Sequence, residues 1–364
     1  MKTFICECGN TLHFENSRCM ACGRQLGFIH EDLQLSALEP ADNGQWRSLA
    51  NGRYYRQCAN YRQYNICNWL VPAEDSQTYC HSCRLNRIIP NLSESQNIKL
   101  WYRIEIAKRR LLYTLYKLKL PVVDRKQDAQ QGLAFKFMQD QTRYDEFSNT
   151  VTEVNQVMTG HHNGVITINI LEAEDSAREQ MREQMNEGYR TLLGHFRHEI
   201  GHYYWMRLIR SGGKLESFRE LFGDERQDYK QAIKNYYRQK NLSTWQDGFI
   251  SAYASAHPWE DWAETWAHYL HMVDTLETAN DIGFRIQNDP HALNDEREES
   301  DLSSVKGMNF DALMDDWASL TIGLNALNRS MGLPDAYPFV LSAPVLEKLR
   351  FVHHLITGRN NFEC

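Results

Sequence analysis

The sequence predicts an α+β protein that is mainly helical, and three observations support this fold class. Long stretches of the 364-residue chain repeat apolar residues at spacings of three and four, the period of an amphipathic helix. One short segment, Gly164–Asn169, alternates in polarity and is rich in β-branched residues, as β-strands are. Eight of the nine cysteines lie within the first 83 residues, so a cysteine-rich part precedes a larger, mostly helical part.

Composition limits the class of protein before any motif is considered. The chain is 42% hydrophobic and 24% charged, which is ordinary for a globular protein. Its formal net charge of -7 gives no overall attraction to the phosphates of nucleic acid. There is no stretch of 18 apolar residues and no apolar segment of a secretory signal near the start. We therefore expect a cytoplasmic protein that does not cross a membrane.

The first cysteine quartet predicts a structural zinc site. It consists of Cys6, Cys8, Cys19 and Cys22. Two close pairs separated by a short loop supply the four thiolates that a tetrahedral structural zinc requires. Zinc ribbons commonly have two residues between paired cysteines, whereas a single residue separates Cys6 from Cys8. Coordination by three of these cysteines, or another arrangement, therefore stays open.

The second quartet predicts a further structural zinc site. It consists of Cys58, Cys67, Cys80 and Cys83. Its first pair is wide, so its signal is weaker than that of the first quartet. Disulfides are the alternative, but thiols stay reduced in the cytosol and paired cysteines there favour metal. Cys364 is left over at the C-terminus, where we expect a free thiol without function.

A helix is predicted over residues 97–119. Its apolar face carries Leu100, Ile104, Leu111, Leu112, Leu115 and Leu118. The segment from Arg84 to Lys119 is also rich in lysine, arginine and aromatic residues, a pattern that fits a nucleic-acid surface. We favour the amphipathic helix, with the basic residues on its solvent-exposed face, and do not expect nucleic acid as a partner.

The most informative motif is His198-Glu-Ile-Gly-His202, which lies in a stretch predicted to be helical. Ser176 and Glu179 form a capping box at the start of that stretch, Gly188 is a possible break, and Gly212–Gly213 marks its end. Residues four apart lie on the same face of a helix, so His198 and His202 can hold one metal ion. Glu199 can then reach a water on that ion, the arrangement of a zinc hydrolase. His195 lies on the same helix, and we interpret it as a polar neighbour.

A second helix, which begins at Pro258, offers the third ligand that a catalytic zinc usually has. Glu260 and Glu264 are four residues apart and share a face of this helix, and His268 follows one turn later. The residues alone leave the choice open between Glu260, Asp261, Glu264 and His268. The strand at Gly164–Asn169 leads into the metal-binding helix, which suits a protease because an exposed sheet edge can pair with an extended substrate.

Taken together, these patterns divide the chain into four segments. We predict a zinc ribbon over residues 1–30, a second four-cysteine zinc unit over 50–95, a large domain over 97–290 and a helical region over 307–364. The acidic stretch from Asn288 to Lys306 is predicted to be an exposed loop. The C-terminal helices are expected to break at Gly332–Pro334 and near Pro338.

On these motifs the sequence resembles the gluzincin metallopeptidases, the group that contains thermolysin and anthrax lethal factor. The resemblance implies that Glu260 is the third zinc ligand and that Glu264 supports the imidazole of a ligand histidine. It also implies a role for Tyr253, seven residues before Glu260, in stabilising the oxyanion with its hydroxyl. A tyrosine packed in the core is the alternative interpretation of Tyr253.

Across almost its whole length the chain is similar to a bacterial family of zinc-binding metallopeptidases with an N-terminal zinc-ribbon-like region. This similarity rests on Phe14-Glu15-Asn16 with the flanking cysteines, on the segment from Gly188 to His202, and on the segment from His257 to Glu264. It implies a zincin-like metallopeptidase domain. It does not define a substrate.

The predicted function is that of a zinc-dependent peptidase with one catalytic and two structural zinc ions. Glu199 would take a proton from the zinc-bound water that attacks the scissile carbonyl. A peptide or protein would be the substrate, and the zinc ribbons would serve structure or hold a substrate or protein partner. The alternative is a non-catalytic regulatory protein whose ribbons bind protein or nucleic acid, but an intact Glu199 argues against it.

Overall fold

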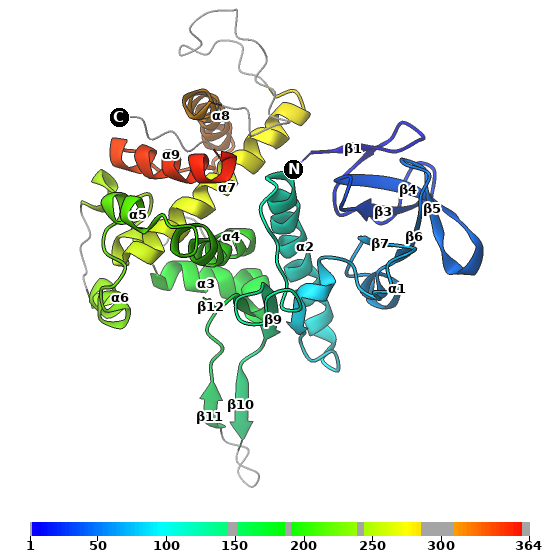
Figure 1. Cartoon of the computed structure of the whole chain (residues 1–364), viewed down its shortest axis with the longest axis horizontal. Helices are drawn as coiled ribbons and strands as arrows, with labels where there is room; N and C mark the ends of the chain where they lie inside the picture. Colours follow the sequence, from blue (N-terminus) through cyan, green and yellow to red (C-terminus); the bar gives the residue numbers. More distant parts are fainter. Residues whose placement is uncertain (1, 145–150, 186–190, 239–243, 285–308, 359–364) are drawn as a thin grey trace, which may run out of the picture. The chain divides into compact units, whose positions relative to one another are not determined.

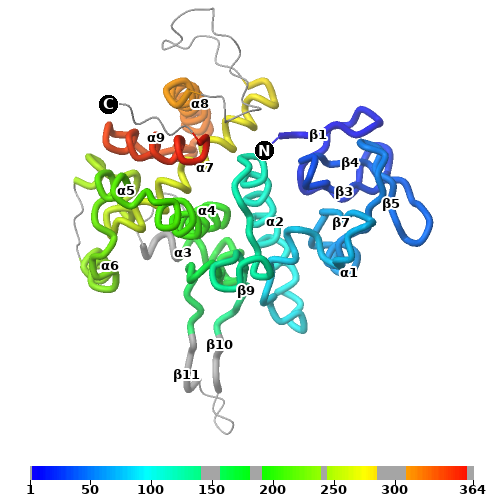
Figure 2. The backbone as a smooth tube through the Cα atoms, in the orientation of Figure 1, coloured from blue at the N-terminus to red at the C-terminus, as the bar shows by residue number. Residues whose placement is uncertain are grey.

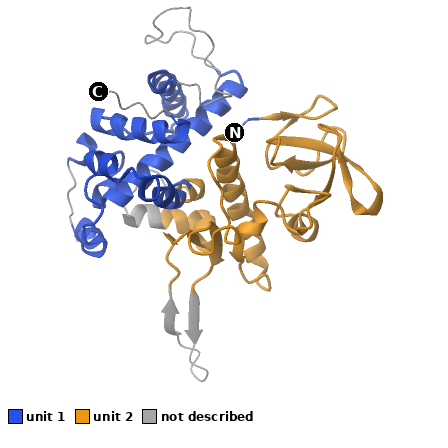
Figure 3. Cartoon of the chain, viewed as in Figure 1, with its two compact units in different colours: residues 1–2, 197–364 blue, residues 3–196 orange. Residues whose placement is uncertain are grey.

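The computed structural model describes residues 2–144, 151–185, 191–238, 244–284 and 309–358 (Figure 1). The chain forms two compact units, one of residues 3–196 and one of residues 197–364 together with the first two residues (Figure 3). The first unit contains the strands and the long helix α2, and the second is built from helices. The predicted α+β class with much helix is confirmed.

The strands of the first unit form four sheets. The strands are β1 (Phe4–Ile5), β2 (Thr11–Leu12), β3 (Gln25–Ile29), β4 (Gln34–Pro40), β5 (Trp46–Ser48), β6 (Tyr54–Gln57), β7 (Leu70–Pro72), β8 (Asn86–Ile88), β9 (Ala134–Met138), β10 (Gln141–Tyr144), β11 (Val151–Asn155), β12 (Gly160–His162) and β13 (Val165–Asn169). The first two strands pair with each other, and so do β10 and β11.

A five-stranded antiparallel sheet connects the two cysteine-rich segments. Its strands lie in the order of the sequence, β3 to β7, and Figure 2 lets the reader follow the chain through them. Ile29, Leu38, Tyr55 and Leu70 form a buried cluster on this sheet. The first cysteine quartet precedes β3, while the second begins after β6 and continues past β7. One sheet therefore positions both quartets.

The second sheet of this unit has the order β12-β13-β9-β8 and is partly parallel. The strand predicted at Gly164–Asn169 is confirmed as β13 (Val165–Asn169). It does not lie at the edge of the sheet, because β12 pairs with one side of it and β9 with the other. The edge is occupied by the three-residue strand β12.

Three helices lie wholly within the first unit, α1 (Ala59–Tyr64), α2 (Ser95–Lys117) and α3 (Asp175–Met185). The helix predicted over 97–119 is confirmed as α2, and Ile104, Leu111 and Leu112 are buried as expected. Phe14 packs edge-on against Phe28 and Tyr113, with ring centroids 4.9 and 5.5 Å away, so this aromatic contact ties α2 to the cysteine-rich part.

The expectation that the basic residues of α2 face solvent was wrong for two of them. Lys108 and Arg109 are buried, and polar partners on α2 itself and on other segments compensate them. Lys108 Nζ lies 2.9 Å from the equally buried carboxylate of Glu105, and Arg109 donates to the backbone carbonyl of Ile66. The periodicity of the helix shows its apolar face but cannot show partners that other segments supply.

Helices make up the second unit. They are the second half of α4 (Leu192–Tyr204), α5 (Leu215–Phe222), α6 (Tyr229–Arg238), α7 (Pro258–Asp281), α8 (Phe310–Ser330) and α9 (Ala343–Thr357). The long helix α7 packs against α5, α8 and α9 (Figure 1). Trp262 and Trp266 of α7 are fully buried, and Trp266 stacks on Tyr204 of α4 with centroids 4.9 Å apart. Aromatic packing therefore forms the core around α7.

The helical stretch predicted from Ser176 to Gly212 consists of more than one element. It comprises α3, α4 and a π-helical segment, Trp205–Arg210, that continues α4 to its end. The possible break at Gly188, the acidic loop at 288–306 and Cys364 lie outside the described residues. Within the described ranges, none of the helices has the length and apolar character needed to cross a membrane.

Candidate metal centres

The helix α4 carries the two histidines of the central motif. His198 and His202 are one turn apart, and their ring centroids lie 5.0 Å from each other. Glu199 follows His198 directly and is 8% exposed. The helical period therefore brings both imidazoles to one face of α4, as the sequence predicts.

The helix α7 brings Glu260 to these histidines. Pro258 is its first residue, and the side chain of His257 caps it by accepting a hydrogen bond from the backbone N–H of Trp259 at 3.1 Å. Glu260 thus lies in the first turn, where the helix dipole favours a negative charge. Its side chain is only 2% exposed.

Close packing of α7 on α4 sets the distance between the donors. A Cβ atom placed on Gly201 would lie 3.1 Å from Cα of Ala263 and 3.2 Å from Cβ of Trp266, which is tighter than ordinary contact. Trp262 Nε1 donates a hydrogen bond of 2.8 Å to the carbonyl oxygen of Gly201 at the same place. The absence of a side chain at Gly201 therefore lets the two helices approach closely enough to share a ligand set.

The donor atoms of His198, His202 and Glu260 converge as the ligands of one ion would. Glu260 Oε2 lies 3.0 Å from His198 Nε2 and 3.7 Å from His202 Nε2, close to the roughly 3.3 Å expected between neighbouring N or O ligands of a tetrahedral zinc. Although it is buried, Glu260 Oε2 accepts no hydrogen bond from the part of the chain that the structure describes. Three such donors fit zinc and leave a fourth position for a substrate or water.

The other ring nitrogen of His198 is held by Glu264. His198 Nδ1 lies 2.7 Å from Glu264 Oε1, and Ser251 Oγ donates a hydrogen bond of 2.6 Å to Glu264 Oε2. Burial alone would raise the pKa of Glu264, but the hydrogen bonds and charge of His198, with the bond from Ser251, lower this pKa to about 2. The carboxylate is therefore ionised and accepts the proton on Nδ1, which leaves Nε2 with a free lone pair for a metal.

The carboxylates around the histidines favour positive charge at this place. Burial opposes a charge on His198, yet the carboxylates of Glu260 and Glu264 beside its two ring nitrogens raise the pKa of His198 well above its usual range. The pKa of Glu260 is held well below its usual range by His202 and His198, against the effect of burial. A divalent cation would satisfy this negative potential without protonating the imidazole.

Two tyrosines lie beside the candidate ligands. Tyr229 of α6 donates a hydrogen bond of 2.8 Å to Glu260 Oε1, and its hydroxyl is also hydrogen-bonded to that of Tyr253. The Tyr253 ring centroid lies 5.9 Å from that of His198. Burial, reinforced by Glu260, raises the pKa of both tyrosines. Both hydroxyls therefore keep their protons and can donate hydrogen bonds.

Tyr229 and Ser251 were missed in the sequence. Neither belongs to a periodic motif, since Tyr229 is on a different helix, 31 residues before the carboxylate that it contacts. The only available signal for Ser251 was its position two residues before Tyr253. Their roles follow from folding rather than from spacing.

The remaining alternatives for the third ligand have other partners. Asp261 Oδ2 lies 2.6 Å from Lys348 Nζ, and His268 Nδ1 lies 2.8 Å from the hydroxyl of Tyr337. Glu264 is on the far nitrogen of His198, as described above. Within the first unit, His195 Nδ1 contacts the buried carboxylate of Glu172. Of the four candidates, the geometry brings Glu260 to the two histidines.

The first cysteine quartet also forms one cluster. Cys6 Sγ lies 3.7 Å from Cys22 Sγ, and Cys8 Sγ lies 3.7 Å from Cys19 Sγ. These separations match the roughly 3.8 Å edge of a tetrahedral zinc–thiolate site, and they far exceed a disulfide bond of about 2.05 Å. The backbone N–H of Cys22 lowers the pKa of the Cys19 thiol to about 6, which favours the thiolate that a metal binds. All four cysteines can therefore share one ion despite the short Cys6–Cys8 spacing.

The second quartet is completely buried. Cys67 Sγ lies 3.7 Å from Cys80 Sγ, and backbone N–H groups donate to the sulfurs, for example that of Cys83 to Cys80 at 3.5 Å. Arg109 is buried beside this cluster. Burial opposes its charge, but Cys67, then Glu105 and other cysteines, outweigh burial and raise the pKa of Arg109. A buried cation here would offset the excess negative charge of a zinc held by four thiolates.

Comparison with known proteins agrees with these features. Residues 97–355 match the profile of a family described as putative zinc-binding metallo-peptidase, and residues 3–94 match that of a zinc-ribbon domain. Uncharacterised proteins of Mycobacterium bovis and of two Mycobacterium tuberculosis strains are each 43% identical over 358 residues, covering 98% of this chain and 95% of theirs. No solved structure matches the chain. The family resemblance drawn from the sequence motifs is confirmed.

Proposed function

Because the chain belongs to the family of putative zinc-binding metallo-peptidases, we propose that it hydrolyses peptide bonds at the site formed by α4 and α7. The observation that carries this proposal is the convergence of His198 Nε2, His202 Nε2 and Glu260 Oε2 beside a buried glutamate that is not part of the ligand set. A purely structural zinc site has four protein ligands and no use for such a glutamate.

His198, His202 and Glu260 would hold the zinc of this site. When bound, zinc supplies a Lewis acid and lowers the pKa of the attacking water toward neutrality. The hydrogen bond to Glu264 fixes the tautomer of His198, so that Nε2 stays unprotonated. The hydrogen bond from Tyr229 holds Oε1 of Glu260 and orients the other oxygen toward the histidines.

Proton transfer is the proposed task of Glu199. Its carboxylate takes a proton from the water as this water attacks the scissile carbonyl, and passes the proton to the nitrogen of the departing amine. The hydroxyl of Tyr253 keeps its proton and is proposed to donate a hydrogen bond to the carbonyl oxygen as negative charge develops there. The raised pKa of Tyr253 thus preserves the proton that this hydrogen bond needs.

We further propose two structural zinc ions in the cysteine clusters and a cytoplasmic location, where such thiols stay reduced. The exposed side chains of Ile5 and Met20, 62% and 88% accessible, flank members of the first cluster. Exposed apolar side chains beside a rigid zinc site suit contact with a protein. A peptide or protein substrate, or a protein partner, is therefore the proposed ligand of the N-terminal region, rather than nucleic acid.

The test is cleavage of an unbiased peptide library by the zinc-loaded full chain and by its Glu199→Gln variant. We expect Glu199→Gln to keep its zinc and to lose activity by about 10²–10⁴-fold, the usual contribution of a general base. The matched control is Glu216→Gln on α5, whose side chain is 90% exposed and which should cleave as the wild type does.

Three outcomes would contradict the proposal. Wild-type cleavage by Glu199→Gln would exclude this residue as the base. Cleavage that Glu199→Gln abolishes together with zinc binding would make the residue a ligand rather than a base. A chain that binds zinc but cuts no member of the library or of a denatured proteome would favour a binding function for the N-terminal region.

A further inference from the structure

A second group of two histidines and one glutamate lies in the unit of residues 3–196. His30 and Glu31 follow strand β3, while His81 comes from the turn between Cys80 and Cys83. One donor atom from each of the three residues lies within 4.8 Å of the others. Neither the predicted catalytic site nor the two cysteine clusters uses these residues.

The geometry of this group is that of ligands around a point rather than of a simple ion pair. His30 Nδ1 lies 3.0 Å from Glu31 Oε2, the separation that His198 and Glu260 have at the first site. Despite this proximity, the buried Nδ1 atom makes no hydrogen bond within the described part of the chain. The side chain of His30 is only 9% exposed, so Nδ1 has little access to water. A buried nitrogen lone pair beside a carboxylate calls for a shared partner.

Contact between the two histidine rings is a second indication that the group shares a partner. The ring centroids of His30 and His81 lie 3.7 Å apart, with an angle of 31° between the planes. A neutral imidazole has one nitrogen lone pair, so this contact places two such donors side by side. Two imidazole nitrogens with one carboxylate oxygen are a donor set that binds zinc and other divalent first-row metals.

Neighbouring residues hold this group in place. His30 stacks on Trp69 at an angle of 11°, with centroids 6.2 Å apart, and its other neighbour is Tyr116 at 5.6 Å. The backbone of His81 is fixed because Cys83 N–H donates to Cys80 Sγ and Arg84 N–H donates to the carbonyl of Cys80. The donors are therefore arranged before any ion binds, which lowers the entropic cost of binding.

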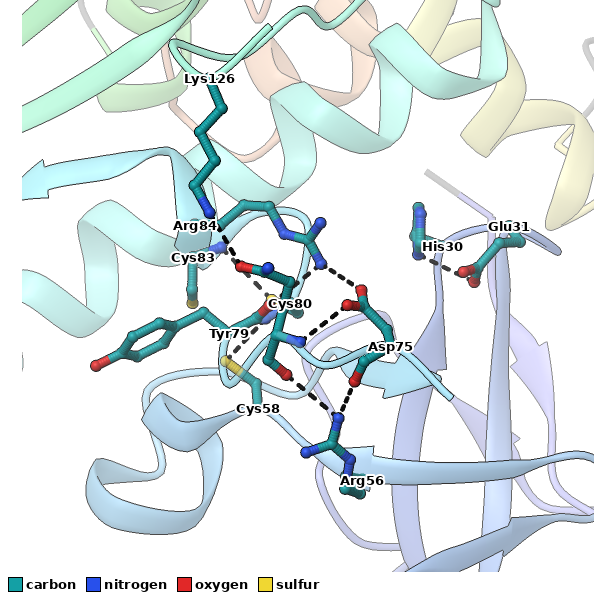
Figure 4. Close-up of polar contacts among 11 residues, drawn as sticks. His30, Glu31, Arg56, Cys58, Asp75, Tyr79, Cys80, Cys83, Arg84 and Lys126 are labelled. Atoms are coloured by element: carbon teal, nitrogen blue, oxygen red, sulfur yellow. Dashed lines mark hydrogen bonds and ion pairs between the residues drawn. The ribbon is translucent and has the colours of Figure 1, made fainter. Parts of the chain in front are cut away.

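Arg84 carries a positive charge that acts on His81, and this charge is already compensated. Arg84 Nη2 lies 2.9 Å from Asp75 Oδ2, and the backbone carbonyl of Asp75 accepts a hydrogen bond from Arg56 (Figure 4). Figure 4 also shows His30 and Glu31 facing each other on the side of Asp75 away from Cys58. Since Asp75 pairs with Arg84, this arginine opposes a cation at the histidines less than a free one would.

We propose that His30, Glu31 and His81 form a further zinc-binding site. Three protein ligands leave a coordination position for water or a fourth ligand. The side chain of Glu31 is 40% exposed, so the ion would exchange with solvent more readily than one in the buried second cysteine cluster. The chain would then bind one zinc beyond those of the α4–α7 site and the cysteine clusters, and would do so reversibly.

The test measures zinc bound by the full chain at a series of buffered free zinc concentrations. The main variant is Glu31→Gln, which changes a partly exposed side chain and leaves the cysteines intact. The matched control is Asp32→Asn, the next carboxylate in the chain, which contacts Asn51 and is not a member of the group. We expect Glu31→Gln to weaken the most weakly held equivalent at least tenfold, and Asp32→Asn to leave it unchanged.

Cobalt separates this site from the cysteine clusters. Cobalt bound by thiolates gives an intense charge-transfer band in the near ultraviolet, whereas nitrogen and oxygen ligands give only weak visible bands. We expect His30→Gln to remove one equivalent of cobalt with no loss of the thiolate band. The proposal would be overturned if the wild type, Glu31→Gln and His30→Gln bound equal amounts of metal. It would also be overturned if Asp32→Asn lost the additional equivalent of metal as completely as Glu31→Gln does.

Discussion

The two units of the chain hold their candidate metal ligands in opposite ways. In residues 3–94, eight cysteines come from turns and loops between short strands and form closed sets of four. In residues 197–358, two long helices present three ligands that leave one position open. The second cysteine cluster is fully buried, whereas the histidine site is lined by partly exposed side chains, such as His202 at 16%.

This difference is the one expected between a metal that completes a fold and a metal that takes part in the proposed hydrolysis. The strands of residues 3–94 are only two to seven residues long and share one buried cluster, so zinc bound at closed thiolate sites would add substantially to their free energy of folding. The helical unit has a buried aromatic core around Trp262 and Trp266, which does not depend on an ion. We therefore expect metal removal to affect the two units differently.

The largest expected effect is that of a strong zinc chelator. Structural zinc sites of this kind contribute on the order of 10 kcal/mol each at neutral pH, comparable with the whole free energy of unfolding of a domain. We expect chelation to abolish protection against hydrogen exchange in residues 3–94 and to preserve it in α7, α8 and α9. Hydrogen exchange with mass spectrometry measures both regions at once. Equal retention of protection in both units would contradict the expected difference between them.

A smaller difference should separate the two cysteine clusters. Cys80 is fully buried and Cys8 is exposed. The substitution Cys80→Ser would leave a buried site with an unpaired hydroxyl and the charge of Arg109 uncompensated, at a cost of about 3–5 kcal/mol. We expect Cys8→Ser to cost less, because water can replace the lost ligand. Chemical denaturation of the two variants, read from the first unit, gives both values, and a larger loss in Cys8→Ser would reverse this ranking.

Acid should destabilise the helical unit through buried histidines. Burial lowers the pKa of His268 to about 4, from 6.5 in an unfolded chain, so below pH 6.5 the unfolded state takes up a proton that the folded state does not. The stabilisation is complete above pH 6.5 and is lost as the pH falls toward 4, by roughly 3 kcal/mol at most. Asp261 acts in the opposite sense, because burial raises its pKa to about 7.

The difference between the wild type and His268→Gln isolates this effect, since Asp261 is common to both. We expect the free energy of unfolding of the variant to fall less between pH 6.5 and pH 4. Both proteins are measured with chelator present throughout, so that loss of zinc does not contribute. If the free energy of unfolding changed with pH in the same way in both proteins, His268 would take up its proton in the folded state as readily as in the unfolded state.

The smallest expected effect concerns the hydrogen bonds behind His198. Glu264→Gln keeps the shape of the side chain but removes its charge, and should weaken zinc binding at the α4–α7 site by about 10–100-fold. Ser251→Ala removes one hydrogen bond to the same carboxylate and should weaken zinc binding less than Glu264→Gln does. Competition with a zinc-binding dye measures both. A stronger effect of Ser251→Ala would mean that Glu264 does not act through its charge.

Local patterns of the sequence were enough to predict the elements that carry the site. The period of three and four located α2 to within a few residues, Pro258 marked the start of α7, and the β-branched alternation located β13. The pairing of His198 with His202 follows from the helical period alone. The position of Glu260 beside them depends on how α7 packs on α4, so it could be anticipated only through resemblance to a known family.

Contacts between distant segments could not be predicted in this way. The hydrogen bond from Tyr229 to Glu260 joins two helices that no spacing relates. His30 follows β3 and His81 lies beyond β7. These strands are at opposite edges of the five-stranded sheet, and a bridge between Phe28 and Trp69, which no local pattern predicts, brings the two edges together. Arg109 looks like a solvent-exposed residue of α2 because its partner, the backbone carbonyl of Ile66, lies on another segment. Lys108 contacts Glu105 of α2 but also donates to Asn86 of β8, which no helical spacing relates to it. In each case the missing information is tertiary.

The tight contact at Gly201 helps to recognise members of the family that cannot bind the metal. Within His198-Glu-Ile-Gly-His202, the fourth position acts as a spacer between two helices, since a single methyl group there would press against Cα of Ala263. An alanine there would need the two helices to give way by a few tenths of an ångström, and a bulky residue would need more, which would draw Glu260 away from the histidines while every ligand stayed in the sequence. Relatives with a bulky residue at the position of Gly201 are therefore expected to have lost the metal, and with it any peptidase activity, even though their ligand residues look intact.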